Sequence, residues 1–280
     1  MDTIPKPVLK WAGGKRQIIQ ELKKALPEEG YNRYIEPFIG GGAFLFELQP
    51  EKAIINDYNG ELTNLYKIIR DDADSLIKLL DLYKSKHCKE FYYEVRAMDR
   101  MDDYDKLSDV EKAARTVYLN RTCYNGLFRV NSKGYFNTPI GRYKNPQICD
   151  RENLLAIQSY LKKNKVKINT GDFEKTALLA KAGDFVYLDP PYYPLSPTSS
   201  FTDYTSAGFG EAEQIRLKKL CDKLTQKGVL FLQSNSDCDY IRNLYDGYSI
   251  KEVEVRRSIN SKKDKRDNIK EVLIANYSIV

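Results

Sequence analysis

Apolar residues along most of this chain occur in short runs that alternate with stretches of helical spacing. The short runs predict strands at 33–37, 53–56, 166–169, 184–188 and 229–232. Spacings of three and four residues predict helices at 15–26, 173–180, 211–225 and 240–245, and further segments at 250–255 and 271–277 complete the series. Strands that alternate with helices form a mostly parallel sheet covered by helices on both faces, so the pattern predicts an α/β fold.

The middle of the chain breaks this alternation. From Gly60 to about Asn120 the apolar residues recur only at helical spacing, and Ser108 stands three residues before Glu111, as in a capping box. Residues 127–137 predict a β-hairpin that turns at 131–134, and a helix is expected at 150–163. We therefore expect one discontinuous catalytic, cofactor-binding domain, made of 1–60 and 165–280, interrupted by a helical insert at 61–164 that carries the hairpin.

Composition excludes several classes of protein. The 280 residues are 42% hydrophobic and hold no apolar run near the ~18 residues of a membrane helix. The N-terminus lacks the features of a secretory signal, so we expect a cytoplasmic protein. Five cysteines without a Cys-x-x-Cys pair, and His87 as the single histidine, argue against a disulfide framework and a metal site. We expect inert thiols, no metal, and His87 on the solvated surface.

Acidic residues are missing between Lys112 and Cys149, although the net charge of the whole chain is only +6. Basic and aromatic residues interleave in this stretch: Lys112, Arg115, Tyr118, Arg121, Tyr124, Phe128, Arg129, Lys133, Tyr135, Phe136, Arg142, Tyr143 and Lys144. Cations neutralise phosphates and aromatic rings wedge between bases, so the pattern favours a surface that binds nucleic acid. A basic but purely structural subdomain is the alternative. A second basic run, at 256–266, is expected to be a solvated loop.

Three glycines, Gly40 to Gly42, directly follow the first predicted strand. Glycine lets the backbone bend sharply and approach a ligand closely. Leu45 stands where a dinucleotide motif has its third glycine, so a nucleoside cofactor without phosphates fits better. Asp57 closes the next strand, where its carboxylate can accept hydrogen bonds from ribose hydroxyls. A purely structural glycine turn is the alternative.

Residues 12–16 superficially resemble a phosphate-binding loop. That motif needs glycine at position 9 and serine or threonine at position 16, where this chain has Leu9 and Arg16. We therefore interpret Trp11 as an aromatic contact and Lys15 as the counter-charge of a carboxylate.

The most specific motif is Asp189-Pro190-Pro191-Tyr192, which follows the apolar strand at 185–188. The prolines fix φ and lack an N–H group, so they hold the backbone rigid and leave carbonyl groups for a ligand. Asp189 and the Pro190 carbonyl can accept hydrogen bonds from the two N–H groups of an exocyclic amine, while Tyr192 can stack on a planar base. A rigid surface turn is the alternative.

In this order, five segments resemble the Dam family of DNA adenine-N6 methyltransferases: 10–15, 36–42, 56–57, 171–173 and 189–192. The resemblance covers nearly the whole chain, and 120–129 with 136–144 resembles the target-recognition hairpin of that family. The DpnII-type modification methylases are the most similar subgroup, through 200–205 and 208–209 as well. The resemblance implies a Rossmann-like methyltransferase sheet that transfers methyl from S-adenosylmethionine to N6 of an adenine flipped out of duplex DNA, at GATC.

The resemblance also implies roles for single residues. Those assigned to the cofactor are Trp11, Lys15 at its methionine end, Phe38, Gly40, Gly42, Asp57 at the ribose, Asp172 at the adenine amino group, Phe173 and Asp189. The catalytic motif is Asp189, Pro190, Pro191 and Tyr192. The residues assigned to bases of the DNA are Lys10 at the first guanine, Arg129 at the guanine paired with the last cytosine, and Leu127 and Pro139 at the thymine methyl group. Tyr124 and Asn125 are assigned to a wedge that enters the duplex and contacts its backbone. Arg142 and Lys144 are also assigned to DNA binding. The implied partners are double-stranded DNA and a cognate restriction endonuclease without a stable complex, and the protein is expected to be a monomer.

Three alternatives stay open. A cytosine-N4 DNA methyltransferase would use the same tetrapeptide, as would a protein glutamine methyltransferase, although the acid-free basic hairpin disfavours a protein substrate. A catalytically silent DNA-binding regulator of the same fold is the third. The presence of Lys15, Asp57, Asp189 and Tyr192 argues against it, since a silent protein has no physical need for all four.

Overall fold

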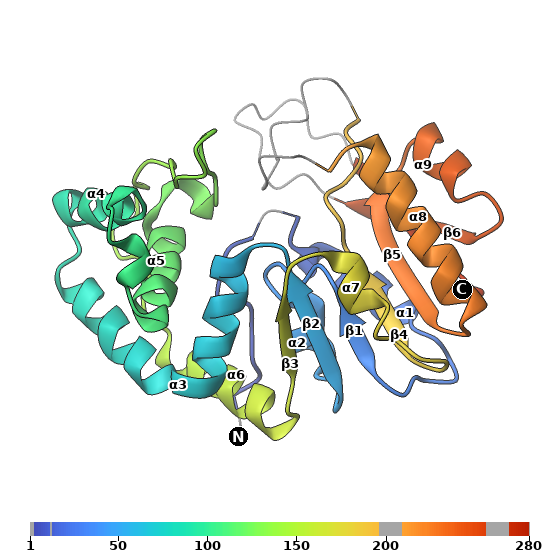
Figure 1. Cartoon of the computed structure of the whole chain (residues 1–280), viewed down its shortest axis with the longest axis horizontal. Helices are drawn as coiled ribbons and strands as arrows, with labels where there is room; N and C mark the ends of the chain where they lie inside the picture. Colours follow the sequence, from blue (N-terminus) through green and yellow to red (C-terminus); the bar gives the residue numbers. More distant parts are fainter. Residues whose placement is uncertain (1–2, 12, 196–208, 256–268, 280) are drawn as a thin grey trace. The chain divides into compact units, whose positions relative to one another are not determined.

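A computed structural model describes residues 3–11, 13–195, 209–255 and 269–279 of the chain (Figure 1). The expectations at 200–205 and 256–266 lie outside these residues. The chain divides into two compact units, which we describe separately. The first comprises 1–14, 40–49 and 57–171, and the second comprises 15–39, 50–56 and 172–280.

Among the described residues, seven strands form one sheet in the order β3-β2-β1-β4-β5-β7-β6. They are β1 (Tyr34–Glu36), β2 (Ala53–Asp57), β3 (Lys167–Thr170), β4 (Phe185–Leu188), β5 (Leu230–Ser236), β6 (Ser249–Val255) and β7 (Ile269–Ala275). β1 pairs in parallel with β2 and β4, and β4 pairs in parallel with β5. β7 runs antiparallel to both β5 and β6. The predicted α/β sheet is confirmed, with an antiparallel end that the pattern did not reveal.

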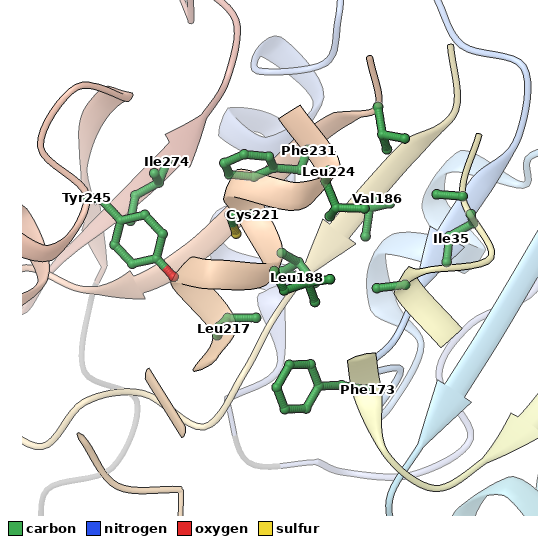
Figure 2. Packing of buried hydrophobic residues seen from close by; sticks show 14 of the residues in the cluster. Ile35, Phe173, Val186, Leu188, Leu217, Cys221, Leu224, Phe231, Tyr245 and Ile274 are labelled. Carbon is green, nitrogen blue, oxygen red and sulfur yellow. The ribbon is translucent and has the colours of Figure 1, made fainter. Parts of the chain in front are cut away.

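The second unit also contains helices, some of which pack on this sheet. They are the 3-10 turn η1 (Lys15–Gln17), α1 (Ile19–Lys24), α7 (Phe173–Ala177), α8 (Glu211–Gln226) and α9 (Asp239–Leu244). Leu217, Cys221 and Leu224 share one face of α8, because residues three and four apart lie on the same side of a helix. They are fully buried against β4 and β5 residues such as Leu188 and Phe231 (Figure 2). This packing fixes the carboxyl end of β4, where the Asp-Pro-Pro-Tyr motif begins.

The first unit is mainly helical, and its stretch from 60 to 120 is helical as predicted. It contains α2 (Ala43–Leu48), α3 (Gly60–Ser85), α4 (Lys89–Ala97), α5 (Asp109–Thr122) and α6 (Arg151–Lys163), with short 3-10 turns η2 (Met98–Arg100), η3 (Tyr104–Lys106) and η4 (Tyr124–Gly126). α3 packs against both α5 and α6. The capping box of α5 is confirmed, since Ser108 Oγ accepts from the Glu111 N–H group and the Glu111 carboxylate accepts from Ser108 N. α2 was not predicted, because six residues after a glycine turn give too short a pattern.

The predicted hairpin is present in reduced form. One isolated antiparallel bridge joins Val130 and Phe136, and Asn131 N donates to the Tyr135 carbonyl at 2.9 Å. The turn closes as expected, because Gly134 N donates to the Asn131 carbonyl and Gly134 has a φ of +81°, which favours glycine.

Predictions about four residues were wrong. His87 is not on the solvated surface: it is half-buried, its Nδ1 lies 2.8 Å from the Tyr118 hydroxyl, and burial lowers its pKa. Arg115, Tyr118 and Phe136 are buried, and Arg115 forms an ion pair with Asp99, so none of the three is part of a nucleic-acid surface. The five cysteines are free thiols. Among the described residues no group of side chains could hold a metal ion, and no described helix has the length and apolarity to cross a membrane.

Candidate functional site

The end of β4 places Asp189 at the carboxyl edge of the sheet, next to a buried lysine. Lys15 Nζ lies 2.8 Å from Asp189 Oδ1, and Ser234 Oγ on β5 donates to the same oxygen at 2.9 Å. The side chain of Lys15 is 6% exposed and that of Asp189 is 21% exposed, so solvent screens the pair weakly. Burial raises the pKa of the Asp189 carboxyl, and Lys15 and Ser234 oppose part of that rise. The expectation that Lys15 is the counter-charge of a carboxylate is confirmed.

The rest of the Asp-Pro-Pro-Tyr motif is fixed from both sides. The Pro191 carbonyl accepts a hydrogen bond from the buried Gln214 of α8 at 3.0 Å, whereas the Pro190 carbonyl has no donor among the described residues. The Tyr192 hydroxyl donates to Glu271 Oε2 on β7 at 2.8 Å, and Lys15 Nζ lies 4.7 Å from the centre of the Tyr192 ring. The motif therefore presents two acceptors, Asp189 and the Pro190 carbonyl, beside a held aromatic ring.

Asp172 caps the N-terminus of α7 and also binds an arginine. Its Oδ1 accepts from Glu174 N at 3.0 Å and from Arg216 Nη2. Arg216 also pairs with Glu174 at 3.1 Å and lies 4.5 Å from the centre of the Phe173 ring. Both bonds to Asp172 use one oxygen of the carboxylate, so Arg216 and the cap together fix the direction of the other oxygen.

Three phenylalanines gather in the same unit. Phe38, which follows β1, stacks on Phe173 with ring centres 5.0 Å apart, and Phe209 lies 5.9 Å from each of them. The cluster gives the predicted residues Phe38 and Phe173 an apolar setting suited to a planar ring.

In the first unit the glycine turn faces Trp11. Gly40 has a φ of +47°, and a Cβ added there would lie 2.9 Å from Trp11 Cδ1, while Gly42 has a φ of +70° and no room beside Tyr66. Gly40 N donates to Asp57 Oδ2 at 3.0 Å, and Asn59 N donates to Asp57 Oδ1 at 2.9 Å. Burial raises the pKa of the Asp57 carboxyl, and these N–H groups oppose that rise. Trp11, the glycines and Asp57 are therefore adjacent, as expected for parts of one ligand site.

The residues predicted to bind DNA surround the hairpin of the first unit. Lys10 exchanges backbone hydrogen bonds with the Asn120 amide, both at 2.8 Å, and its Nζ donates to the Tyr143 hydroxyl. Arg129 is exposed, and its Nε donates to Asn137 Oδ1 at 2.8 Å across the hairpin. The others are exposed as well: Tyr124, Asn125, Leu127, Pro139, Arg142 and Lys144.

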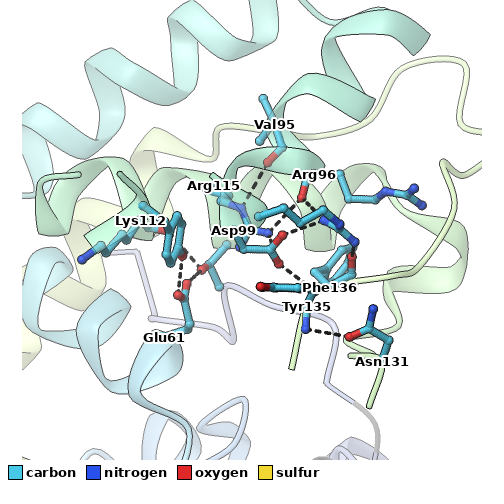
Figure 3. Close-up of polar contacts among 12 residues, drawn as sticks. Glu61, Val95, Arg96, Asp99, Lys112, Arg115, Asn131, Tyr135 and Phe136 are labelled. Carbon is cyan, nitrogen blue, oxygen red and sulfur yellow. Dashed lines mark hydrogen bonds and ion pairs between the residues drawn. The ribbon is translucent and has the colours of Figure 1, made fainter. Parts of the chain in front are cut away.

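Asp99 joins the hairpin to the helices behind it (Figure 3). Its Oδ2 accepts from the Phe136 N–H group at 2.7 Å and lies 2.7 Å from Arg115 Nη2. Arg100 donates to the Phe136 carbonyl at 2.7 Å, and Arg115 Nε donates to the Val95 carbonyl at 3.1 Å. Arg115 therefore supports the hairpin from within.

Sequence reasoning missed four of these supporting residues: Asp99, Arg216, Ser234 and Glu271. Each is a single polar side chain far along the chain from the motif that it touches, and it has no local pattern that would mark it.

Comparisons with known proteins show the family to which the chain belongs. The family model described as "D12 class N6 adenine-specific DNA methyltransferase" matches residues 11–259. The chain is 47% identical over 272 residues to the "Type II methyltransferase M1.LlaDCHI" of Lactococcus lactis subsp. cremoris, covering 97% of this chain and 95% of that protein. It is 46% identical to the "Type II methyltransferase M.MjaIII" of Methanocaldococcus jannaschii, covering 97% and 99%. It is 32% identical to the "DNA adenine methylase" of Escherichia coli strain K12, covering 95% and 93%.

Among solved structures, a precorrin 8W decarboxylase from Methanobacterium thermoautotrophicum aligns with 98% of each chain at 13% identity. Its TM-score of 0.38 is too low to bear on fold or function.

Proposed function

Because the chain belongs to the D12 class of N6 adenine-specific DNA methyltransferases, we propose that it moves a methyl group from S-adenosylmethionine to N6 of an adenine flipped out of duplex DNA, at GATC. The observation that carries this proposal is the buried Lys15–Asp189 pair beside Tyr192, at the end of β4. We assign catalysis and cofactor binding to 1–60 and 165–280, and DNA recognition to 61–164.

Labelling of DNA tests the proposal. The protein is incubated with methyl-labelled S-adenosylmethionine and unmethylated duplexes that carry GATC or a scrambled site, and the digested nucleosides are separated. We expect labelled N6-methyladenine from the GATC duplex alone. Labelled N4-methylcytosine would overturn the target base, and equal labelling of both duplexes would overturn the recognition sequence.

The residues present fit the cofactor. Gly40 has a positive φ and a Cβ there would meet Trp11, so the backbone lies directly against Trp11 where Gly40 N donates to Asp57. Asp57 would accept from the ribose hydroxyls and Asp172 from the adenine amino group, with Phe38 and Phe173 against the ring. Lys15 would lie near the methionine end. When bound, the cofactor supplies a methyl group attached to a positively charged sulfur. The sulfur is a good leaving group, because it becomes a neutral thioether once the methyl group is transferred.

The chain's own contribution is position. Asp189 and the Pro190 carbonyl would accept hydrogen bonds from the two hydrogens of the adenine amino group and hold its nitrogen in line for transfer, while Tyr192 stacks on the base. As the nitrogen gains the methyl group it loses one of these two protons to solvent. Lys15 favours the ionised form of Asp189, which accepts hydrogen bonds more strongly than the neutral acid. This scheme needs no covalent intermediate.

Recognition of DNA is assigned to the exposed residues of the hairpin region. Lys10 would contact the first guanine, Arg129 the guanine paired with the last cytosine, and Leu127 and Pro139 the thymine methyl group. The remaining residues would wedge into the duplex or contact its backbone: Tyr124, Asn125, Arg142 and Lys144. We further propose that the enzyme acts as a monomer in the cytoplasm, alongside a restriction endonuclease of the same specificity. The type II names of two relatives support the last point.

Substitution of Lys15 by methionine should shift the pH dependence of methylation. Lys15 lowers the pKa of Asp189 against the effect of burial, so K15M raises that pKa further. Activity requires ionised Asp189 and falls as pH falls through its pKa, so the acid limb of the pH–rate profile moves to higher pH. Single-turnover rates measured from pH 5 to 9 test this. The exposed Lys219→Met on α8 is the control, and an unmoved acid limb in K15M would contradict the assignment.

Substitution of Arg216 by glutamine should weaken cofactor binding more than it slows methyl transfer. Arg216 holds one oxygen of Asp172 and lies over the Phe173 ring, so R216Q loosens both groups. We expect the Kd for S-adenosylmethionine, measured by calorimetry without DNA, to rise about fivefold to tenfold, since one charge-assisted hydrogen bond is lost. Lys219→Gln should leave the Kd unchanged. An equal Kd in R216Q and the wild type would show that Asp172 does not need Arg216.

A further inference from the structure

Glu271 is a largely buried carboxylate to which the proposed reaction assigns no role. It lies on β7, where its backbone is opposite Ser236 of β5 and Val253 of β6. Burial raises the pKa of its carboxyl, and Lys15 opposes that rise. Among the described residues, the donor that satisfies this carboxylate is the Tyr192 hydroxyl, at 2.8 Å. A carboxylate withdrawn from water is costly unless it is hydrogen-bonded, so its retention is tied to Tyr192.

The contacts hold Tyr192 at both ends. Gln214 fixes the carbonyl of the preceding Pro191 at 3.0 Å, and the proline rings restrict the backbone. At the far end of the side chain, Glu271 fixes the hydroxyl, and a bond to a carboxylate is shorter and stronger than one to a neutral acceptor. The ring therefore has one orientation, with Lys15 Nζ 4.7 Å from its centre.

We propose that Glu271 is a positioning residue, which holds the Tyr192 ring through its hydroxyl in the orientation that stacks on the target adenine. This inference rests on the proposed function, because it uses the stacking role of Tyr192. Glu271 does not touch the reacting atoms. Its effect on methyl transfer passes through the bond to the Tyr192 hydroxyl, and this separates it from residues that merely stabilise the sheet.

A double-mutant cycle tests the proposal. Glu271→Leu removes the acceptor, Tyr192→Phe removes the donor but keeps the ring, and the third variant combines both. We expect each single change to lower the single-turnover rate of adenine methylation about tenfold, as loss of one hydrogen bond to a charged group does. The double variant should be no slower than the slower single variant. If the two losses multiply to about a hundredfold, Glu271 acts by another route and the proposal fails.

Two further variants serve as controls for the cycle. Glu271→Gln keeps an oxygen that accepts from the hydroxyl, so its rate should stay within about threefold of the wild type; a loss as large as in E271L would overturn positioning through this bond. Glu252→Leu, on the neighbouring strand β6, removes a surface carboxylate paired with Lys270 and should leave the rate unchanged.

A second readout does not depend on methyl transfer. With 2-aminopurine in place of the target adenine and no cofactor present, stacking of the base on a held tyrosine ring quenches its emission and gives a short-lifetime component. We expect that component in the wild type and E271Q and its reduction in E271L, with unchanged duplex affinity. If E271L keeps the component in full, Glu271 does not position the ring. If the wild type lacks it, the stacking role of Tyr192 in the proposed function is what fails.

Discussion

Asp189→Ala is expected to lower the rate of methyl transfer at least about a thousandfold, while duplex affinity changes less than about threefold. The alanine removes the acceptor that would hold and polarise the target amino group, and position with electrostatic help accounts for factors of this size. The hairpin residues assigned to DNA keep their own contacts in the first unit, such as the 2.8 Å bond from Arg129 to Asn137. Single-turnover labelling measures the rate, and fluorescence anisotropy of a labelled duplex measures the affinity.

Two companion variants sharpen this experiment. Asp189→Asn keeps the shape of the side chain but places an amide where Lys15 Nζ and Ser234 Oγ now meet a carboxylate, so it should be nearly as inactive as D189A. Asp246→Ala removes an exposed carboxylate from the same unit and should retain full activity. Full methylation by D189A would exclude Asp189 from catalysis, and loss of its folded circular dichroism spectrum would mean that the carboxylate serves the fold.

The features that could be predicted from the sequence are those formed by residues next to one another in the chain. The apolar strand before Asp189, the glycines before α2 and the turn at Gly134 are local patterns, each with a direct physical cause in strand burial or positive φ. The direction of β7 was not predictable, because its apolar residues have the same spacing in a parallel and an antiparallel strand. α2 was missed because six residues give no helical period.

The supports of the site were hidden for a different reason. Ser234 and Glu271 each occupy one position of a strand whose pattern otherwise reports only burial, and they meet the motif through the folding of β5 and β7 beside β4 and its loop. Arg115 was misassigned because its partner Asp99 lies outside the acid-free stretch, so the charge pattern showed a cation without its counter-ion. Local charge counts therefore overstate a binding surface wherever a helix buries one of its arginines.

Arg129→Ala is expected to relax the choice of sequence more than it slows methylation. The Nε group of Arg129 donates to Asn137 Oδ1 at 2.8 Å, and the two terminal nitrogens of the Arg129 guanidinium have no partner among the described residues. This arrangement suits a bidentate contact of the guanidinium with O6 and N7 of a guanine. Such a contact contributes ~1–3 kcal/mol to discrimination, or about fivefold to 150-fold. The ratio of single-turnover rates on GATC and on duplexes altered at the last base pair should fall by that factor in R129A, while the rate on GATC falls less.

Two controls separate the reading of a base from general attraction to DNA. Lys133→Ala, at the exposed tip of the same hairpin, removes a cation without that geometry, so it should weaken binding to all duplexes alike and leave the ratio unchanged. Asn137→Ala keeps Arg129 but releases its Nε, so it should lower the ratio by less than R129A does. If R129A and K133A lower affinity equally and neither changes the ratio, Arg129 contacts the phosphate backbone, and the guanine is read by another residue.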